Sequence, residues 1–450
     1  MNYNFRLMLY IIDHTITMPI NTLIMGAAGR DFHNFLMYFK DNNKYNVKCF
    51  TANQIPGISG KKFPKELSGK LYKSGIKIYY EKELPHLIKS KKIELCVLSY
   101  SDLSNKEVME KISYIQSLGC DFMILGPNST QLNSKKPIIS VTAVRTGCGK
   151  SQITRHISKI LSDKKIKHSI IRHPMPYGIL KNQIFQKFES SNDLNKYDLT
   201  IEEREEFEKH LENGATVYCG IDYKKILNDA EKNSSIIIWD GGNNDFEFYN
   251  SDLKIVVLDP LRKDNEINYY PGLTNLIRAD IAIINKINSA NKTQINNCIN
   301  NIKLKNKKAK IIMTESIYDT PRTNKKNILV IEDGPTTTHG NMSYGVAYLA
   351  AKKLNKKIIK PRKYASGYYK KIYEKYKNLE YIIPAIGYNR NQINDLKNMV
   401  NKINPEAIFS GSPIDIKKLL NLDIQVFDIN YKIKDNKGII KRYITNFLNK

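Results

Sequence analysis

The chain has 450 residues, and 41% of them are hydrophobic, so it can bury two or three ordinary cores and is not disordered throughout. Its formal net charge of +27 comes mostly from lysines scattered among asparagine, isoleucine and tyrosine, with no basic arm that interleaves with aromatic residues. This composition disfavours nucleic acid as a partner and favours a small polyanionic substrate. The 6 cysteines form no CxxC pair, which predicts free thiols in a reducing cytoplasm and no zinc site.

Residues 1–20 are predicted to be a tail or an over-extended start. Their apolar run at residues 7–12 is interrupted by Asp13 and His14, and no small-residue cleavage site follows it. The run is also too short to cross a bilayer. We therefore expect no targeting signal, no membrane association and a cytoplasmic location.

Short apolar runs alternate with segments of helical periodicity from residue 21 onward. This alternation is typical of an α/β protein with mainly parallel sheets. Residues 21–136 are predicted to form a Rossmann-like N-terminal domain that ends at the polar stretch before Pro137. Residues 137–450 are predicted to form a P-loop NTPase domain with a mainly parallel sheet and a C-terminal α/β extension from about residue 361. The strands of this second series are expected at residues 138–144, 169–172, 235–239, 254–258, 281–285, 309–313 and 328–331.

Residues 144–151, with the sequence VRTGCGKS, lie between an apolar run and a segment with helical periodicity. Strand, glycine loop and helix in this order predict a phosphate-binding loop, because glycines turn backbone N–H groups toward phosphate oxygens and the helix N-terminus adds partial positive charge. Lys150 is expected to bridge the β- and γ-phosphates of ATP or GTP, and Ser151 to bind Mg²⁺. A glycine turn without a nucleotide is the alternative. The residues expected to bind the nucleotide here are Thr146, Gly147, Cys148, Gly149, Lys150, Ser151 and Gln152.

Two residues of this loop depart from the general pattern. Val144 stands where the pattern has its first glycine. Arg145 stands where the deviant P-loops of the SIMIBI class of NTPases carry a signature lysine, as in KGGxGKT. This resemblance implies a second positive charge near the transferred phosphoryl group, so Arg145 is a predicted catalytic residue beside Lys150.

Two later strand ends add candidate residues. Asp240 follows the apolar run 236–239 and is predicted to be a catalytic carboxylate that also binds Mg²⁺, with a turn aspartate as the alternative. Asn285 and Lys286 follow a later apolar run and are similar to the start of the guanine-recognition motif NKxD. Asn288 replaces the final aspartate of that motif and lacks its charged acceptor. The base, adenine or guanine, therefore stays open, and an Asn-Lys turn is the alternative.

Five segments carry a wider resemblance. They are GAAGRDFHNF at residues 26–35, the loop at residues 144–151, RHPMPYG at residues 172–178, DGGNND at residues 240–245 and DPLR at residues 259–262. Together they resemble the cyclic 2,3-diphosphoglycerate synthetase family, also filed as predicted GTPases, over roughly residues 21–433. The resemblance implies an enzyme that uses ATP to close the two phosphates of 2,3-diphosphoglycerate into an internal anhydride.

Arginine and histidine stand together after two expected strands, Arg30 with His33 and Arg172 with His173. Arginine binds phosphate oxygens bidentately, so both pairs are candidate clamps for a substrate with two phosphates and a carboxylate. His339, in the segment DGPTTTHG, is a further candidate for an anion site. A surface ion pair or a satisfied histidine is the alternative for each pair, and a long turn is the alternative for the last segment.

Two other features receive a structural interpretation. The acidic run at residues 201–206 is predicted to be a solvated helix face with internal salt bridges, and metal binding is its alternative. Cys148 is predicted to be a small filler, since no histidine is placed by sequence to activate it as a nucleophile.

The leading prediction is an ATP-dependent, Mg²⁺-requiring enzyme that forms a phosphoanhydride on a small phosphorylated acid such as 2,3-diphosphoglycerate. The competing prediction is a SIMIBI-type GTPase or NTPase that acts as a regulatory or chaperone switch on a protein partner. The sequence gives no sign of a membrane partner and leaves a homo-oligomer open.

Overall fold

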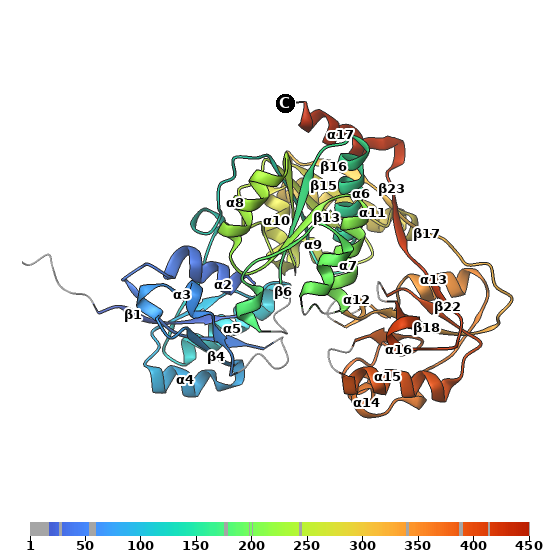
Figure 1. Ribbon diagram of the computed structural model, residues 1–450, viewed down its shortest axis with the longest axis horizontal. Helices are drawn as coiled ribbons and strands as arrows, with labels where there is room; N and C mark the ends of the chain where they lie inside the picture. The colour runs from blue at the N-terminus through green and yellow to red at the C-terminus, as the bar shows by residue number, and fades with distance from the viewer. Residues whose placement is uncertain are drawn as a thin grey trace, which may run out of the picture. The chain divides into compact units, whose positions relative to one another are not determined.

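The structure is a computed structural model, and it describes residues 18–26, 29–53, 60–174, 179–197, 199, 201–242, 245–338, 342–386, 390–412 and 415–449. The chain divides into two compact units. The first comprises Met1–Tyr100, Glu107–Thr130 and Ile179–Lys181, and the second comprises Ser101–Lys106, Gln131–Gly178 and Asn182–Lys450 (Figure 1). Among the described residues, no helix has both the length and the apolar character needed to span a membrane.

The first unit contains a six-stranded sheet in the order β3-β4-β2-β1-β5-β7, and every pairing is parallel except that of β3 with β4. The strands are β1 (Ile20–Met25), β2 (Tyr45–Ala52), β3 (Lys62–Phe63), β4 (Ile76–Tyr80), β5 (Leu95–Leu98) and β7 (Asp121–Ile124). The helices are α2 (Arg30–Asn34), the π-helix Phe35–Phe39, α3 (Lys65–Ser68), α4 (Leu84–Lys91) and α5 (Asn105–Ser117).

Aromatic side chains form much of the core of this unit. The ring centroids of Phe32 and Phe63 lie 4.9 Å apart, and those of Phe35 and Phe50 lie 5.9 Å apart, both edge to face. This arrangement suits the ring quadrupoles and brings α2 and the π-helix against β2 and β3. β5 is buried at every position, as expected for an inner parallel strand.

The second unit contains an eight-stranded sheet in the order β10-β11-β9-β12-β8-β13-β15-β16, and only the pairing of β10 with β11 is antiparallel. Its strands β8, β12 and β15 are largely apolar and are buried at every position, because helices cover both faces of a parallel sheet. The strands are β8 (Ile138–Ala143), β9 (His168–Arg172), β10 (Gln186–Phe188), β11 (Thr216–Cys219), β12 (Ile236–Asp240), β13 (Leu253–Leu258), β15 (Ile281–Ile284) and β16 (Lys310–Met313).

The helices of this sheet follow its strands along the chain. They are α6 (Lys150–Asp163), α7 (Ile201–Glu212), α8 (Tyr223–Asn233), α9 (Asn265–Asn268), α10 (Gly272–Arg278), α11 (Lys292–Lys305) and α17 (Ile439–Leu448). In α6, Ile153, Ile157, Ile160 and Leu161 are buried in the main core, which is the apolar face that the helical periodicity predicts. Two short strand pairs complete this part: β6 (Leu103–Ser104) with β14 (Tyr269–Tyr270), and β17 (Glu315–Tyr318) with β23 (Tyr431–Lys434).

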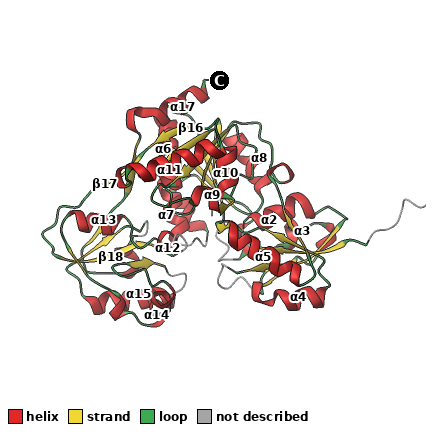
Figure 2. Ribbon diagram, turned by 180° about the vertical axis from the view of Figure 1, so that it is seen from behind, coloured by secondary structure: helices red, strands yellow, loops and turns green. Residues whose placement is uncertain are grey.

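A separate sheet occupies the C-terminal part of the second unit. Its strands are β18 (Asn327–Asp333), β19 (Lys357–Ile358), β20 (Ile383–Ala385), β21 (Ala407–Ser410) and β22 (Val426–Asp428), and all of their pairings are parallel. The helices are α12 (Gly334–Thr337), α13 (Val346–Lys353), α14 (Gly367–Lys375), α15 (Arg390–Ile403) and α16 (Ile416–Leu420). Figure 2 shows β18 between α13 on one side and α14 and α15 on the other.

One sequence expectation needs a correction here. The strand expected at residues 328–331 was placed in the series that follows the P-loop, but among the described residues β18 pairs with β19, β20 and β21 of the C-terminal sheet. An apolar run shows that a strand is buried and not which strand it pairs with. The α/β fold class with mainly parallel sheets is confirmed.

Candidate nucleotide-binding site

The carboxyl ends of neighbouring strands in the eight-stranded sheet carry most of the candidate residues. β8 lies between β12 and β13, and the chain reaches β9 and β12 on one side of β8 and β13 and β15 on the other. Ligands of open parallel sheets bind at such a switch point, outside the carboxyl ends of the strands. Lys150, Arg172, Asp240, Asn285 and Lys286 therefore belong to one edge of one sheet.

The glycines of the loop after β8 are required by its backbone. Gly147 has a φ of 86° and Gly149 a φ of 106°, a conformation that L-residues rarely adopt. A Cβ atom on Gly149 would lie 2.2 Å from Nδ2 of Asn285, so no side chain fits there. α6 begins at the next residue, Lys150, and its N-terminus therefore adjoins the loop. The loop has the elements of a phosphate cradle.

Val144, which replaces the first glycine of the pattern, is part of the core. Its side chain is buried, and its backbone N–H donates to the carbonyl oxygen of Val257 over 3.1 Å, so the pairing of β8 with β13 continues here. A Cβ atom on Gly272, at the start of α10, would lie 2.3 Å from the carbonyl oxygen of Val144. The glycine that permits this close approach thus lies on α10 and not in the loop.

Lys150 forms an ion pair with Asp240, whose side chain is completely buried. Nη1 of Arg172 donates to the second carboxylate oxygen over 3.0 Å. Burial by itself raises the pKa of Asp240, but the attraction of Lys150 and then of Arg172 outweighs burial and holds this pKa well below its usual value. Asp240 is therefore ionised near neutral pH and positions two cations beside the loop.

Helix α7 supplies residues that the sequence analysis interpreted as solvated. Glu206 forms an ion pair with Arg172, and Glu203 and His210 are buried. Nε2 of His210 lies 3.7 Å from Oδ2 of Asp240, and burial lowers the pKa of this ring, so it is neutral near pH 7. The expectation of a solvated face is wrong for this side of the helix. Glu203, Glu206 and His210 recur at intervals of three and four residues, which places them on one face, turned toward the sheet.

Asn285 and Lys286 bind the loop itself. Nδ2 of Asn285 donates to the carbonyl oxygen of Cys148 over 3.0 Å, and Nζ of Lys286 donates to that of Gly147 over 2.7 Å. Lys286 also pairs with Asp259 at 2.6 Å and has a left-handed backbone, with a φ of 59°. Such a conformation at a non-glycine residue persists only where its surroundings hold it, often at functional sites. The two residues therefore fix the shape of the loop.

The side-chain amide of Asn288 forms two hydrogen bonds with the backbone of Ser316. Its Nδ2 donates to the carbonyl oxygen of Ser316 over 3.0 Å, and its Oδ1 accepts from the Ser316 N–H over 3.0 Å. Gln152 accepts from the hydroxyl of the same serine over 3.2 Å. The NKxD-like segment thus has Asn288 in place of the aspartate, and the Oδ1 atom of Asn288 is hydrogen-bonded to the backbone of β17.

Arg145 is held by residues of other segments. Its Nε lies 2.8 Å from Oδ1 of Asp102, its Nη1 donates to Asn265 over 3.1 Å, and its guanidinium lies 3.7 Å from the ring centroid of Tyr269. Burial raises the pKa of Asp102, while the charge of Arg145 opposes that shift. A role of Arg145 at the transferred phosphoryl group stays a prediction.

His173 lies in an aromatic cluster at the end of β9. Its Nδ1 is 2.7 Å from the hydroxyl oxygen of Tyr223, and its Nε2 is 3.5 Å from Oδ2 of Asp245. The rings of Trp239 and Phe248 lie edge to face with it, at centroid distances of 5.2 and 4.8 Å. Packing therefore orients His173, and its role as a substrate ligand stays a prediction.

Arg30 and His33 belong to the first unit and are buried there. Nε2 of His33 lies 2.6 Å from the carbonyl oxygen of Thr130, so this nitrogen carries the proton. Burial, followed by the charge of Arg30, lowers the pKa of His33 to about 3. The ring is neutral at physiological pH and adds no positive charge to a clamp. His339 lies outside the described residues.

The cysteines are buried and free, Cys148 among them. Burial raises the pKa of the Cys148 thiol to about 11, so the side chain stays protonated and fits the predicted role of a filler. Ser151 and Asp240 are the residues that would hold Mg²⁺, because a hydroxyl and an ionised carboxylate are the hard oxygen donors that this ion prefers. Within the described ranges, no cluster of three or more histidine, cysteine or acidic residues could hold a metal by itself. Two such donors suit an ion that the nucleotide phosphates also bind.

Sequence reasoning missed several residues of this edge. Asp259 directly follows the buried strand β13, as Asp240 ends β12, so the same rule would have found it. Glu206 and His210 could have been found from their helical spacing. Asp102 carries no comparable signal, because it lies 43 residues before its partner Arg145.

Comparisons with known proteins place the chain in a family, although no family model matches it. The chain is similar to arginine synthetase ArcE of Thermococcus kodakarensis, with 48% identity over 417 residues that cover 92% of this chain and 93% of ArcE. The chain belongs to the ArcE family. The name of ArcE gives arginine as its product, whereas the resemblance found in the sequence implies a cyclic phosphoanhydride.

Two solved structures are more distant from this member of the ArcE family. LpxK of Aquifex aeolicus, crystallised in complex with ATP, is 14% identical to this chain, with a TM-score of 0.40. The match covers 76% of this chain and 95% of LpxK. A duf1611 family protein of Anabaena variabilis is 8% identical to this chain, with a TM-score of 0.20. That match covers 65% of this chain and 94% of the other protein. At these levels neither structure bears on the site.

Proposed function

We propose that this chain is an ATP-dependent synthetase that makes arginine, by phosphorylating the ureido oxygen of citrulline and replacing the phosphate with ammonia. The observation that carries the proposal is the phosphate cradle at residues 144–151, with Lys150 paired to a buried carboxylate, in a chain 48% identical to an arginine synthetase over 92% of its length. A P-loop supports nucleotide-driven chemistry, and the relative's name supports the product.

The chemistry follows from what separates a ureido group from a guanidinium. Carbon carries an oxygen in the first and a nitrogen in the second, and oxide or hydroxide is a poor leaving group. Transfer of the γ-phosphoryl group to the ureido oxygen forms an O–P bond and breaks the bond to ADP. Ammonia then attacks the carbon, the C–O bond breaks, inorganic phosphate leaves and one proton is lost from the new nitrogen. The sum is ATP, citrulline and ammonia to arginine, ADP and phosphate.

The residues at the sheet edge suit the first of these steps. Phosphoryl transfer needs little covalent chemistry from a protein and depends on positioning and charge neutralisation. Lys150 would exchange Asp240 for the nucleotide phosphates, and Arg172 would keep Asp240 paired when Lys150 leaves it. When bound at Ser151 and Asp240, Mg²⁺ would neutralise charge on the β- and γ-phosphate oxygens.

The same edge offers both signs of charge to an amino-acid acceptor. Citrulline carries an ammonium and a carboxylate, which require an anionic and a cationic partner. Glu206 is partly exposed, its side chain keeping 25% of its accessible surface, and its partner Arg172 lies beside Asp240. We propose that this ion pair opens to receive the acceptor.

The test is a reconstitution with purified protein, Mg²⁺-ATP, citrulline and ammonium chloride. We expect arginine, ADP and phosphate in equal amounts, with arginine measured by amino-acid analysis. With ¹⁸O in the ureido group, the label should appear in the phosphate, which is read by phosphorus NMR. If no arginine forms, or if the phosphate carries no label, the proposed reaction is wrong.

The ring closure implied by the cyclic 2,3-diphosphoglycerate synthetase resemblance is the second candidate. It rests on the sequence resemblance, and it requires ATP consumption that depends on 2,3-diphosphoglycerate, with a cyclic product visible by phosphorus NMR. The same assay therefore separates the two reactions. Slow hydrolysis of ATP or GTP that responds to neither substrate would instead support the regulatory switch.

A further inference from the structure

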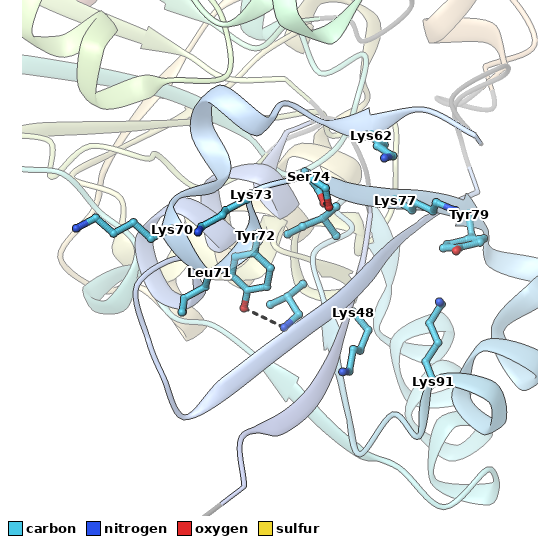
Figure 3. A pocket seen from close by; sticks show the side chains of 13 residues that line it. Lys48, Lys62, Lys70, Leu71, Tyr72, Lys73, Ser74, Lys77, Tyr79 and Lys91 are labelled. Atoms are coloured by element: carbon cyan, nitrogen blue, oxygen red, sulfur yellow. Dashed lines mark hydrogen bonds between the residues drawn. The ribbon is translucent and has the colours of Figure 1, made fainter.

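The first unit holds a cavity of about 620 Å³ whose lining is rich in lysine (Figure 3). We call it the lysine cavity. Of its 13 lining residues, six are lysines and none is acidic. The lysines are Lys48, Lys62, Lys70, Lys73, Lys77 and Lys91.

The lysines come from several elements of this unit. Lys48 comes from β2, Lys62 from β3 and Lys77 from β4, Lys91 ends α4, and Lys70 and Lys73 belong to the turn that precedes β4. β4 begins at the cavity, so the cavity lies toward the amino ends of the parallel strands. Gly26 and Arg30 follow the carboxyl end of β1, at the other end of this sheet. The cavity is thus distinct from the candidate anion site that the sequence suggested in this unit.

Two other lysines of the same unit have a carboxylate partner. Lys111 pairs with Glu81, and Lys181 pairs with Glu66 at 3.1 Å. In the part of the chain that the structure describes, none of the six cavity lysines forms an ion pair; Lys91 has only the ring of Tyr79, 5.3 Å from its Nζ. Like charges around a concave surface repel one another and raise the local concentration of anions.

A second cavity of the same unit has a different lining. That cavity, of about 530 Å³, is lined by residues 36–38 and 41–44, and its charged residues are one aspartate, Asp41, and one lysine, Lys44. The two cavities are similar in size and lie in the same unit, but only one has an unbalanced charge.

We propose that the lysine cavity binds a small ligand with several phosphate groups, at a site separate from the phosphate cradle. Its volume lies within the range of about 300–1,000 Å³ that small-molecule sites occupy. Lysine ammonium groups bind phosphate as point charges and impose little orientation, so the ligand is selected mainly by its charge. A single-stranded nucleic acid binds through aromatic faces on which its bases stack, and here Lys91 lies over the ring of Tyr79.

Calorimetric titration of the full-length protein with inorganic tripolyphosphate, without Mg²⁺, tests the proposal. We expect two binding events, one at the cradle and one at the lysine cavity. Lys150→Ala should remove the first and leave the second. The combined substitutions Lys48→Gln, Lys62→Gln and Lys77→Gln should weaken the second about tenfold or more and leave the first, because they remove half of the unpaired charge.

A matched control changes three exposed lysines near the end of α11 in the other unit. Lys305→Gln, Lys307→Gln and Lys308→Gln alter the net charge of the protein by the same amount, and both affinities should change by less than about twofold. Circular dichroism of each variant verifies the fold, and raising the salt concentration should weaken the cavity event more steeply than the cradle event.

Three outcomes overturn the proposal. One is a single binding event that Lys150→Ala abolishes. Another is equal weakening by the cavity variant and by its control, which would reflect net charge alone. The third is binding of a single-stranded RNA oligonucleotide that is tighter than that of tripolyphosphate and depends on Lys48, Lys62 and Lys77. None of these results depends on whether the protein makes arginine.

Discussion

Positively charged side chains cluster both at the edge of the eight-stranded sheet and in the lysine cavity, but the two clusters differ in their carboxylate partners. At the sheet edge Lys150, Arg172 and Lys286 each face a buried or partly buried carboxylate. In the lysine cavity, six lysines line the surface with no acidic residue among them.

The two regions differ in how firmly the surrounding structure fixes their charged groups. A buried cation loses its hydration and must be paired, so its geometry is fixed before a ligand arrives. An exposed lysine stays hydrated without a partner and attracts anions through its field, which salt screens. The paired region is therefore suited to a defined chemical step, and the unpaired region to recognition by charge.

The largest effect is expected from the loss of the cradle lysine. Lys150→Ala should lower nucleotide turnover about a thousandfold or more, because a positioned cation on the transferred phosphoryl group is lost. Steady-state release of ADP measures it. Lys159→Ala, on the exposed side of the same helix, is the control and should leave turnover unchanged. Full activity of Lys150→Ala would remove the cradle from the mechanism.

Asp240→Asn tests whether the carboxylate partners matter to stability. Removing the charge leaves Lys150 and Arg172 without their buried anion, and the free energy of unfolding should fall by about 3 kcal/mol or more. Urea denaturation measures the change. Asp163→Asn removes an exposed carboxylate whose lysine partner lies 3.9 Å away, and it should cost less than about 0.5 kcal/mol. Equal effects of the two substitutions would contradict the contrast between buried and exposed pairs.

Two buried carboxylates should give opposite pH dependences. The pKa of Asp240 is held well below normal, so its contribution is present above about pH 4 and is lost as the pH falls further. Burial raises the pKa of Glu332 to about 8, although its carboxylate accepts from the backbone N–H groups of Gly345 and Tyr348. A raised pKa means that the folded state holds a proton that the unfolded state releases. Stability therefore falls from about pH 4.3 up to about pH 8, by at most about 1.4 kcal/mol per pH unit.

Glu332→Gln should flatten that fall, because the amide does not ionise. Thermal unfolding at intervals from pH 5 to pH 9 measures the slope. Glu380→Gln, which removes an exposed carboxylate paired with Lys360, should leave the slope unchanged. A slope that survives in Glu332→Gln would mean that this group ionises with an ordinary pKa in the fold.

His33 represents a third case, a polar group that is buried without charge. His33→Phe removes the donor to the carbonyl oxygen of Thr130 and should destabilise the protein by about 1–3 kcal/mol. We expect the KM values and the pH profile of turnover to stay unchanged, because the ring is neutral throughout. His86→Phe, at an exposed position on α4, is the control. A raised KM for a phosphorylated substrate, without loss of stability, would restore the clamp interpretation.

The smallest effect should come from the lysine cavity. The combined substitutions Lys48→Gln, Lys62→Gln and Lys77→Gln should change the free energy of unfolding by less than about 0.5 kcal/mol, and toward higher stability, since like charges are removed. Urea denaturation at low salt measures it. A loss of more than about 1 kcal/mol would show that these lysines have structural partners and would contradict the contrast with the sheet edge.

Local sequence pattern accounts for the strands, the loop and the helix that form the cradle. Largely apolar runs mark β8, β12, β13 and β15, because inner parallel strands are buried on both faces. The GCGKS loop and the face of α6 follow from backbone freedom at glycine and from helical periodicity. Lys150, Asp240 and Asn285 are therefore evident from the amino-acid sequence, since each follows directly from a strand or a loop.

Which groups share an environment depends on tertiary packing. Tertiary packing decides that β18 pairs within the C-terminal sheet, that Glu206 of the acidic helix contacts Arg172, and that Arg145 contacts Asp102. Packing also decides which lysines have a partner: Lys150 pairs with a carboxylate, and the six cavity lysines do not. A local sequence pattern indicates whether a residue is buried or exposed. Ion pairing and pKa depend instead on desolvation and on charges that distant parts of the chain bring close.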